Sequence, residues 1–169
     1  MIDVFPIPTT TTIDYPHQKV HEGRYFSGGV YSASLADTVA LDMLIQGAVQ
    51  STHAKFTVTV TGNSTVQLYE GTTFSVAGAA VSMTNHNRSS SKVFDATVTS
   101  GPTVTGVGTQ INGTGLIPAG DKHTGGGGEF GFGNEFILAP STNYLLRTTN
   151  VSGGAIKISM SIEGYQPTL

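Results

Sequence analysis

The sequence predicts an all-β fold, a two-sheet β-sandwich preceded by an extended N-terminal arm. Apolar residues recur with a period of two in several segments, and glycine, asparagine and proline separate these segments. The chain has 169 residues, a length that fits one domain of ordinary size. We therefore expect an arm over residues 1–22 and one β-sandwich domain over residues 23–169.

The predicted arm is rich in proline. Pro6, Pro8 and Pro16 disfavour a helix and leave few donors for a sheet. The apolar residues of the arm are Val4, Phe5, Ile7 and Ile13, of which the last three are candidate partner contacts. Two interpretations stay open: the arm docks on a partner, or it is a simple disordered tail.

The strand pattern is clearest at residues 156–163, where isoleucine and methionine alternate with polar residues. Residues 55–61 alternate in the same way, and Gly62-Asn63 then supplies a turn before residues 66–69, which predicts a hairpin. Further strands are predicted at residues 25–33, 39–45, 81–85, 94–99, 135–138 and 144–149, roughly eight or nine in all. The residues expected to face the core are Phe56, Val58, Val60, Phe94, Val98, Ile156, Ile158 and Ile162.

Only residues 35–46 also fit a helix, because Leu35, Val39 and Met43 would share one helical face. The β-branched residues in this window and the strands on both sides favour a strand instead.

A glycine-rich connection follows at residues 101–133. Long irregular loops in compact domains are usually functional or disordered. The apolar pair Leu116 and Ile117 lies in its middle and is a second candidate partner contact, with a mobile surface loop as the alternative.

Composition points away from several function classes. Charged residues make up 11% of the chain and the net charge is -3, so charge repulsion would oppose assembly only weakly. Eight lysines and arginines, scattered along the chain, provide no basic patch, and we expect no nucleic-acid partner. No apolar run approaches the roughly 18 residues of a membrane span, and the first residues lack a secretory signal pattern, so we expect synthesis in the cytoplasm and no membrane partner.

The sequence contains few patterns that are typical of a catalytic or ligand-binding site. Cysteine is absent, which excludes disulfides and thiolate metal ligands. The glycine-rich residues 126–131 precede a strand pattern instead of the helix that a dinucleotide site needs. Neither the histidines, His17, His21, His53, His86 and His123, nor the carboxylates predict a site from their spacing. We therefore expect no enzyme, no metal and no cofactor.

A polar cluster at residues 85–88 is the last candidate. Asparagine, histidine and arginine side chains there could bind a partner, with Asn87 and Arg88 as contacts, or could simply stabilise an asparagine-rich turn. The turn is the favoured interpretation.

Several short sequences follow one another in an order that is similar to that of a known class of proteins. His21-Glu22-Gly23-Arg24-Tyr25-Phe26-Ser27, Leu68-Tyr69-Glu70-Gly71, the cluster at 85–88, the glycine-rich loop and residues 133–147 follow one another. This layout, over about residues 23–165, resembles small β-rich structural proteins encoded among the head genes of tailed bacteriophages, including capsid decoration or cement proteins.

The resemblance implies a jelly-roll-like sandwich on the outer capsid surface of a virion. It implies binding to the major capsid protein and self-assembly into an oligomer, with a trimer favoured over a dimer. A receptor- or glycan-binding module of a head or tail fibre is the alternative, although tryptophan is absent and tyrosines are few. A hydrolase on the same fold would need a metal or a carboxylate pair.

Overall fold

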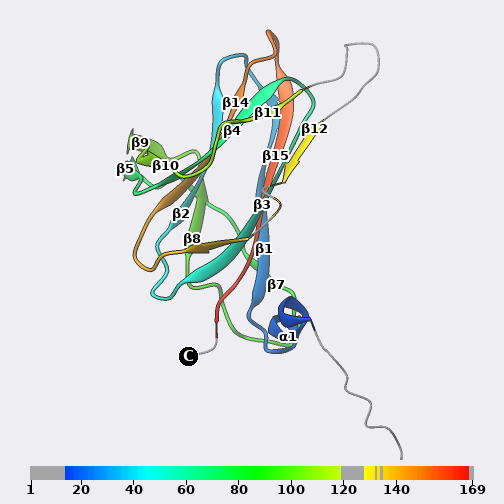
Figure 1. Ribbon diagram of the computed structural model, residues 1–169, viewed down its shortest axis with the longest axis vertical. Helices are drawn as coiled ribbons and strands as arrows, with labels where there is room; N and C mark the ends of the chain where they lie inside the picture. The colour runs from blue at the N-terminus through cyan, green and yellow to red at the C-terminus, as the bar shows by residue number, and fades with distance from the viewer. Residues whose placement is uncertain (1–13, 119–127, 132, 134, 168–169) are drawn as a thin grey trace, which may run out of the picture.

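The computed structural model describes residues 14–118, 128–131, 133 and 135–167. Over these residues the chain is almost entirely β-structure, with one short helix. Two antiparallel sheets face each other across one hydrophobic core (Figure 1). The predicted all-β sandwich is therefore confirmed.

The first sheet has six strands, in the order β12, β3, β15, β1, β7, with β13 also paired to β3. Their bounds are β1 (Tyr25–Leu35), β3 (Thr52–Val60), β7 (Thr84–Asn85), β12 (Gly128–Gly131), β13 (Phe136–Leu138) and β15 (Ile156–Tyr165). Along β3 and β15 buried residues alternate with more exposed ones, so one face lines the core and the other forms an outer face.

The second sheet has seven strands, in the order β10, β4, β14, β2, β8, β6, with β11 also paired to β4. Their bounds are β2 (Ala40–Gln46), β4 (Ser64–Glu70), β6 (Ala79–Ala80), β8 (Thr97–Ser100), β10 (Thr109–Gln110), β11 (Gly115–Ile117) and β14 (Tyr144–Asn150). A separate two-stranded ribbon joins β5 (Thr73–Val76) to β9 (Thr103–Gly106).

Strand pairing is nested along the chain. β1 pairs with β15, β2 with β14, β3 with β12 and β13, and β4 with β10 and β11, always antiparallel. Successive long strands alternate between the two sheets, because β1 and β3 belong to the first and β2 and β4 to the second. The arrangement is that of one long hairpin rolled into two layers.

The core lies where the inner faces of the two sheets meet. Seven of the eight residues predicted for the core are buried, namely Phe56, Val58, Val60, Val98, Ile156, Ile158 and Ile162. Phe94 is half-buried and packs against this core. From the second sheet, Met43, Leu68 and Leu146 contribute side chains with no exposed surface.

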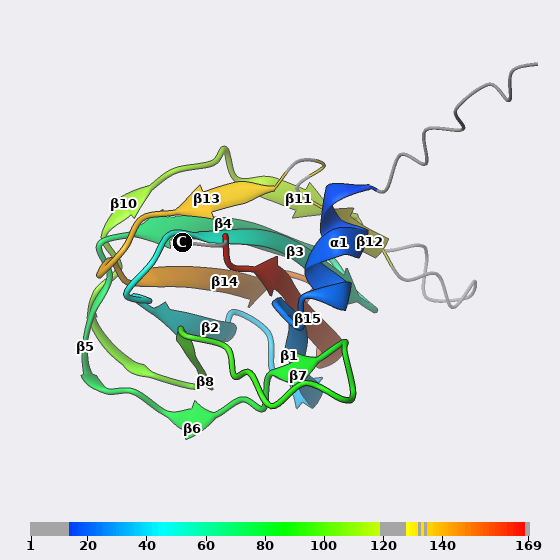
Figure 2. The ribbon, with the colours of Figure 1, turned by 90° about the horizontal axis from the view of Figure 1, so that it is seen from below.

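The predicted extended arm over residues 1–22 is wrong for its last part. Helix α1 spans Tyr15–His21 and lies at one end of the sandwich (Figure 2). Pro16 does not oppose this helix, because it lies in the first turn, where backbone N–H groups have no partner within the helix. Gly23, with φ +67°, then ends the helix: its N–H donates to the Val20 carbonyl, and the Arg24 N–H donates to the Lys19 carbonyl. Residues 1–13 lie outside the described residues.

Some predicted strand boundaries were also wrong. Of residues 81–85 only Thr84–Asn85 forms a strand, and β8 begins at Thr97, three residues after Phe94. The described part of the predicted irregular connection at 101–133 contains β9, β10, β11 and β12. These short edge strands have too few residues to show an alternating pattern. The strand predicted at 39–45 is confirmed as β2.

Candidate functional site

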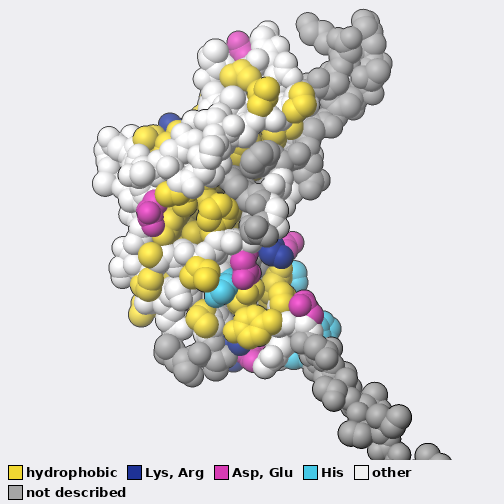
Figure 3. Space-filling view, viewed as in Figure 1, with side chains coloured by type: hydrophobic (Ala, Val, Ile, Leu, Met, Phe, Trp, Pro, Cys, Tyr) yellow, Lys and Arg dark blue, Asp and Glu magenta, His cyan; other side chains and the backbone are white. Residues whose placement is uncertain are grey.

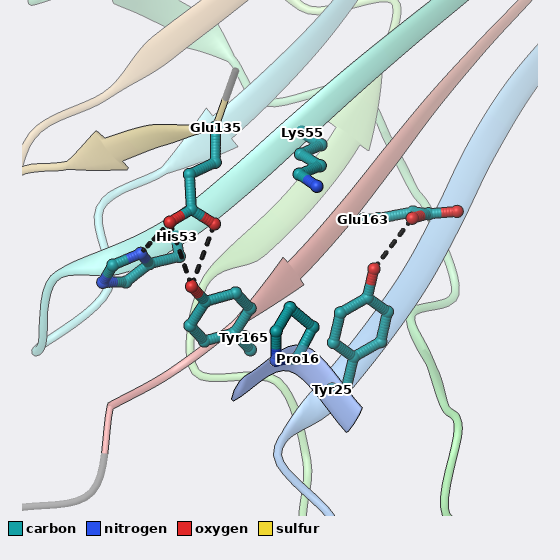
Figure 4. Close-up of a pocket in the computed structure, with 7 residues that line it drawn as sticks. All are labelled: Pro16, Tyr25, His53, Lys55, Glu135, Glu163 and Tyr165. Carbon is teal, nitrogen blue, oxygen red and sulfur yellow. Dashed lines mark hydrogen bonds and ion pairs between the residues drawn. The ribbon is translucent and has the colours of Figure 1, made fainter. Parts of the chain in front are cut away.

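A shallow pocket lies at one end of the outer face of the six-stranded sheet, beside α1 (Figure 4). Sheet register brings its side chains together, because Tyr165 of β15 lies opposite Tyr25 of β1 on one side and opposite His53 of β3 on the other. Alternate residues of a strand point to the same face, so Glu163 joins them from β15. We call this site, defined by Tyr25, Glu135, Glu163 and Tyr165, the tyrosine–carboxylate pocket.

Glu135, just before β13, is the most connected carboxylate of the pocket. Its Oε1 lies 3.0 Å from Nδ1 of His53, and the Tyr165 hydroxyl lies 3.0 Å from Oε1 and 2.9 Å from Oε2. Burial by itself would raise the pKa of Glu135, but the hydrogen bonds from His53 and Tyr165, helped by the charge of Lys55, lower that pKa below its ordinary value. Glu135 is therefore held as a carboxylate.

Glu163 accepts a hydrogen bond from the second tyrosine of the pocket, Tyr25. The Tyr25 hydroxyl donates to Oε2 of Glu163 at 2.8 Å. Burial, together with this hydrogen bond and the negative charge of Glu163, raises the pKa of Tyr25 to about 12. Burial and the bond to Glu135 likewise raise the pKa of Tyr165 above its ordinary value. Both phenols are therefore neutral donors at physiological pH.

Aromatic rings close the pocket from several sides. The rings of His53 and Tyr165 stack at 4.6 Å between centroids with an angle of 16° between planes. Tyr15 of α1 meets the Tyr165 ring edge-on at 5.6 Å, and Pro16 lines the pocket from the same helix. Tyr165 is consequently only 5% exposed. The residues of the pocket therefore also form the contact between α1 and the first sheet.

Lys19 lies one turn after Tyr15 on the same face of α1 and is 2% exposed. Its Nζ lies 2.7 Å from Oε2 of Glu22 and 4.8 Å from the centre of the Tyr15 ring. A buried ammonium is stable only when paired in this way. These partners belong to α1 and its C-cap, so the pairing stabilises the helix itself, while the Tyr15 contact with Tyr165 joins it to the sandwich.

The chemistry available in the pocket is limited by these bonds. The His53–Glu135 pair has the form of a base and its orienting carboxylate, yet no serine, threonine or cysteine is among the described residues that line the pocket. Sequence spacing did not pair any carboxylates, whereas the structure places Glu135 and Glu163 in one pocket. Each is already bonded to a neutral tyrosine, and Tyr15 of α1 packs on one of these tyrosines, Tyr165.

The residues predicted to bind a partner differ in whether the structure describes them and in how exposed they are. Phe5, Ile7 and Ile13 lie outside the described residues. Leu116 is 64% exposed on β11 and stays a candidate. The prediction for Ile117 is wrong, because this side chain is 1% exposed and belongs to the core. Neighbouring residues of a strand point to opposite faces, so only one of this pair could meet a partner.

The cluster at residues 85–88 forms the asparagine-rich turn that was favoured. Asn85 is buried, and its side chain donates to the carbonyls of Gly23 and Lys92 at 2.9 and 3.1 Å. The Asn87 side chain donates to the His21 carbonyl at 3.1 Å, and Arg88 donates to the Asn85 carbonyl at 3.3 Å. This turn therefore holds the C-terminal end of α1, while Arg88 remains exposed.

The expectation that the spacing of the histidines predicts no site is wrong for one pair. His17 and His21 are four residues apart on α1, and their Nε2 atoms lie 3.0 Å from each other. In the described part of the chain, no group of three or more histidine and carboxylate side chains could hold a metal ion. No helix among the described residues is long and apolar enough to cross a membrane.

Known proteins give no indication of the function, which has to be inferred from the fold and the site. No protein family model, no curated protein and no solved structure matches the chain.

Proposed function

We propose that the chain is a decoration subunit that binds the outer surface of a bacteriophage capsid and stabilises the head by bridging major capsid protein subunits. The observation that carries the proposal is the attachment of α1 to the end of the sandwich. Tyr15 and Pro16 fix the helix there, directly after the segment that contains Phe5, Ile7 and Ile13. The apolar segment is thus joined to a rigid anchor from which it can bind a neighbouring subunit.

Strand order supports the same proposal. The nested pairing of β1 to β4 with the later strands, in two sheets, agrees with the proposed jelly-roll arrangement. Jelly rolls occur in viral capsid proteins and in lectins. The fold is therefore compatible with a capsid subunit and with a glycan-binding module, and does not distinguish between these two functions.

Surface character favours a structural subunit. Figure 3 shows that charged side chains on the visible face gather mainly in its lower half, near α1, and much of the rest is uncharged. Exposed apolar side chains include Leu116, Ile137 and Val93, which are 64%, 64% and 81% exposed. Such a surface can be buried in an assembly at little cost in desolvated charge.

A glycan-binding module remains the second candidate because Tyr31 is 62% exposed on β1. An exposed tyrosine ring can stack on a sugar. The tyrosines of the tyrosine–carboxylate pocket do not add to that platform, since Tyr165 is covered by α1 and both hydroxyls are bonded to carboxylates. A structural role therefore takes precedence over a glycan-binding role.

Co-sedimentation tests the proposal. Purified chain is mixed with empty shells of major capsid protein from a tailed bacteriophage that carries it, and we expect saturable binding at a fixed ratio to capsid subunits. A variant with Phe5→Ser, Ile7→Ser and Ile13→Ser should bind at least about tenfold more weakly, because each lost apolar contact costs about 1 kcal/mol or more. A variant with Thr10→Ser and Thr12→Ser on the same segment is the matched control.

The absence of intact chain from the shell pellet would overturn the proposal. Loss of shell binding in Tyr31→Ala with retention in the Phe5, Ile7 and Ile13 variant would overturn the role of the N-terminal segment and transfer shell binding to the exposed face of β1. Light scattering on the same samples measures the oligomeric state, for which we expect a trimer.

A further inference from the structure

Two histidines on α1 form a cluster that the proposed function does not use. His17 and His21 are both exposed, and their rings meet edge-on with centroids 4.7 Å apart. Their Nε2 atoms are separated by 3.0 Å. Residues four apart on a helix lie on the same face, which is why the two rings are in contact.

The helix that carries the pair is held in place on its other side. Lys19 is buried between the two histidines in sequence, so it marks the face of α1 that packs on the domain. The His21 carbonyl accepts the Asn87 side chain at 3.1 Å, and Gly23 and Arg24 close the helix with backbone hydrogen bonds. The two imidazoles are therefore displayed on a fixed backbone, and binding a ligand between them requires little ordering of the chain.

We propose that His17 and His21 form a two-histidine chelate for a divalent transition-metal ion, with Cu²⁺ bound most tightly, followed by Ni²⁺ and Zn²⁺. Imidazole nitrogen is a favoured ligand of all three ions, and their affinities follow this general order. Paired histidines four residues apart on a helix are also the spacing by which zinc helices bind their metal.

The distance between the two nitrogens supports this choice of ions. With metal–nitrogen bonds of about 2.05 Å, a separation of 3.0 Å between the Nε2 atoms corresponds to an angle of about 94° at the metal. Adjacent positions of a square-planar or octahedral ion are about 90° apart, whereas a tetrahedral ion would require roughly 3.3 Å. The nitrogen separation therefore matches copper and nickel, whereas zinc requires the two nitrogens to move slightly apart.

Binding replaces the hydrogen bond between the rings. When both imidazoles are neutral, one Nε2 carries a proton that it donates to the other. For the ion to accept a lone pair from each Nε2, that proton moves through solvent to Nδ1 of the same ring, and none is released overall. Glu22 does not complete the site, because its oxygens receive the Gln18 side chain at 3.0 Å and the Lys19 ammonium at 2.7 Å. Water would fill the remaining positions.

Calorimetric titration of the untagged full-length chain with Cu²⁺, and separately with Ni²⁺ and Zn²⁺, tests the proposal. We expect one ion per chain and no binding of Ca²⁺ or Mg²⁺, which prefer oxygen ligands. His17→Ala and His21→Ala should each weaken binding about a hundredfold, because the remaining imidazole loses the effective concentration supplied by its neighbour. Electron paramagnetic resonance of the copper form should show two equatorial nitrogen ligands.

Matched variants separate this site from adventitious binding. His86→Ala removes an exposed histidine elsewhere, and Gln18→Ala alters α1 without removing a ligand; both should bind as the unchanged chain does. Circular dichroism checks that each variant is folded. If the double variant His17→Ala, His21→Ala binds copper and nickel as tightly as the unchanged chain, or if the unchanged chain binds neither, the proposal is wrong.

Discussion

The Tyr165 hydroxyl lies between both oxygens of Glu135, 2.9 Å from one and 3.0 Å from the other. This contact joins the end of the last strand, β15, to the residue that precedes the edge strand β13. His53 on β3 binds the same carboxylate, so three segments meet at one charge. A neutral donor and a carboxylate at such a junction stabilise the fold only while both are in these protonation states.

Replacing Tyr165 with phenylalanine should destabilise the fold by about 1 to 2 kcal/mol, because a part-buried hydrogen bond to a charged group is lost while the ring is kept. Chemical denaturation measures the change in the free energy of unfolding. Tyr31→Phe is the control, since Tyr31 is 62% exposed and its change should be near zero. Equal losses in the two variants would contradict the role assigned to the Tyr165 hydroxyl.

Acid should remove the contribution of Glu135. Its pKa is lowered in the folded chain, so the folded state binds its proton less readily than the unfolded state does. The stabilisation is complete above the unfolded pKa of about 4.3 and is lost as the pH falls through the lower folded value. We expect Glu135→Gln to be less stable than the unchanged chain at pH 7 and closer to it at pH 3, measured by urea denaturation at both pH values. A constant difference across that range would argue against the prediction.

Alkaline titration reports on Tyr25. Because burial and Glu163 raise its pKa to about 12, its phenol should ionise well after that of an ordinary tyrosine. The stabilisation is complete below the unfolded pKa of about 10 and is lost as the pH rises toward 12. Absorbance at the phenolate band, compared between the unchanged chain and Tyr25→Phe, isolates this group. The transition that Tyr25→Phe removes is the ionisation of Tyr25. A midpoint near pH 10 for it would show that Glu163 does not raise the pKa of this phenol.

The sequence predicts a strand when the strand is long enough for its own residues to show the alternation of apolar and polar side chains. The alternation of Ile156, Ile158, Met160 and Ile162 predicts β15 because each residue meets either the core or solvent. The short strands β6, β7 and β10 are each only two residues long and are set by the neighbours with which they pair. Their own residues contain too little periodic information to predict them.

The site was less predictable than the fold. Glu135 lies 30 residues from Tyr165 and 82 from His53 in the chain, so their meeting depends on the register of β15 and β13 against β3. Helix α1, in contrast, did leave a local signal. Pro16 in the first turn and Gly23 after the last one are typical of helix ends, because proline breaks a helix only beyond its first turn.

The core should respond strongly to truncation of a central side chain. Ile158 is fully buried on β15, and Ile158→Ala should cost about 2 to 5 kcal/mol through lost burial and the cavity left behind. Thr59 is exposed on the neighbouring strand β3, and Thr59→Ala should change stability by less than about 0.5 kcal/mol. Guanidinium denaturation of both variants decides whether the inner and outer faces have been assigned correctly.

Two N-terminal deletions separate the anchor from the segment that precedes it. Removing residues 2–13 should leave stability nearly unchanged, because the buried core residues of the described chain begin at Phe26. Removing residues 2–22 also takes away Tyr15, Pro16 and Lys19, which would uncover Tyr165 and cost about 2 kcal/mol or more.

Thermal unfolding of the two deletions, beside the shell-binding assay, distinguishes a structural role from a binding role. We expect the shorter deletion to keep the melting temperature and lose shell binding, since α1 still covers the pocket while the apolar side chains are gone. The longer deletion should lose both. If the two deletions melt at the same temperature, α1 contributes nothing to the stability of the domain, and the anchor from which the proposed function is argued does not exist.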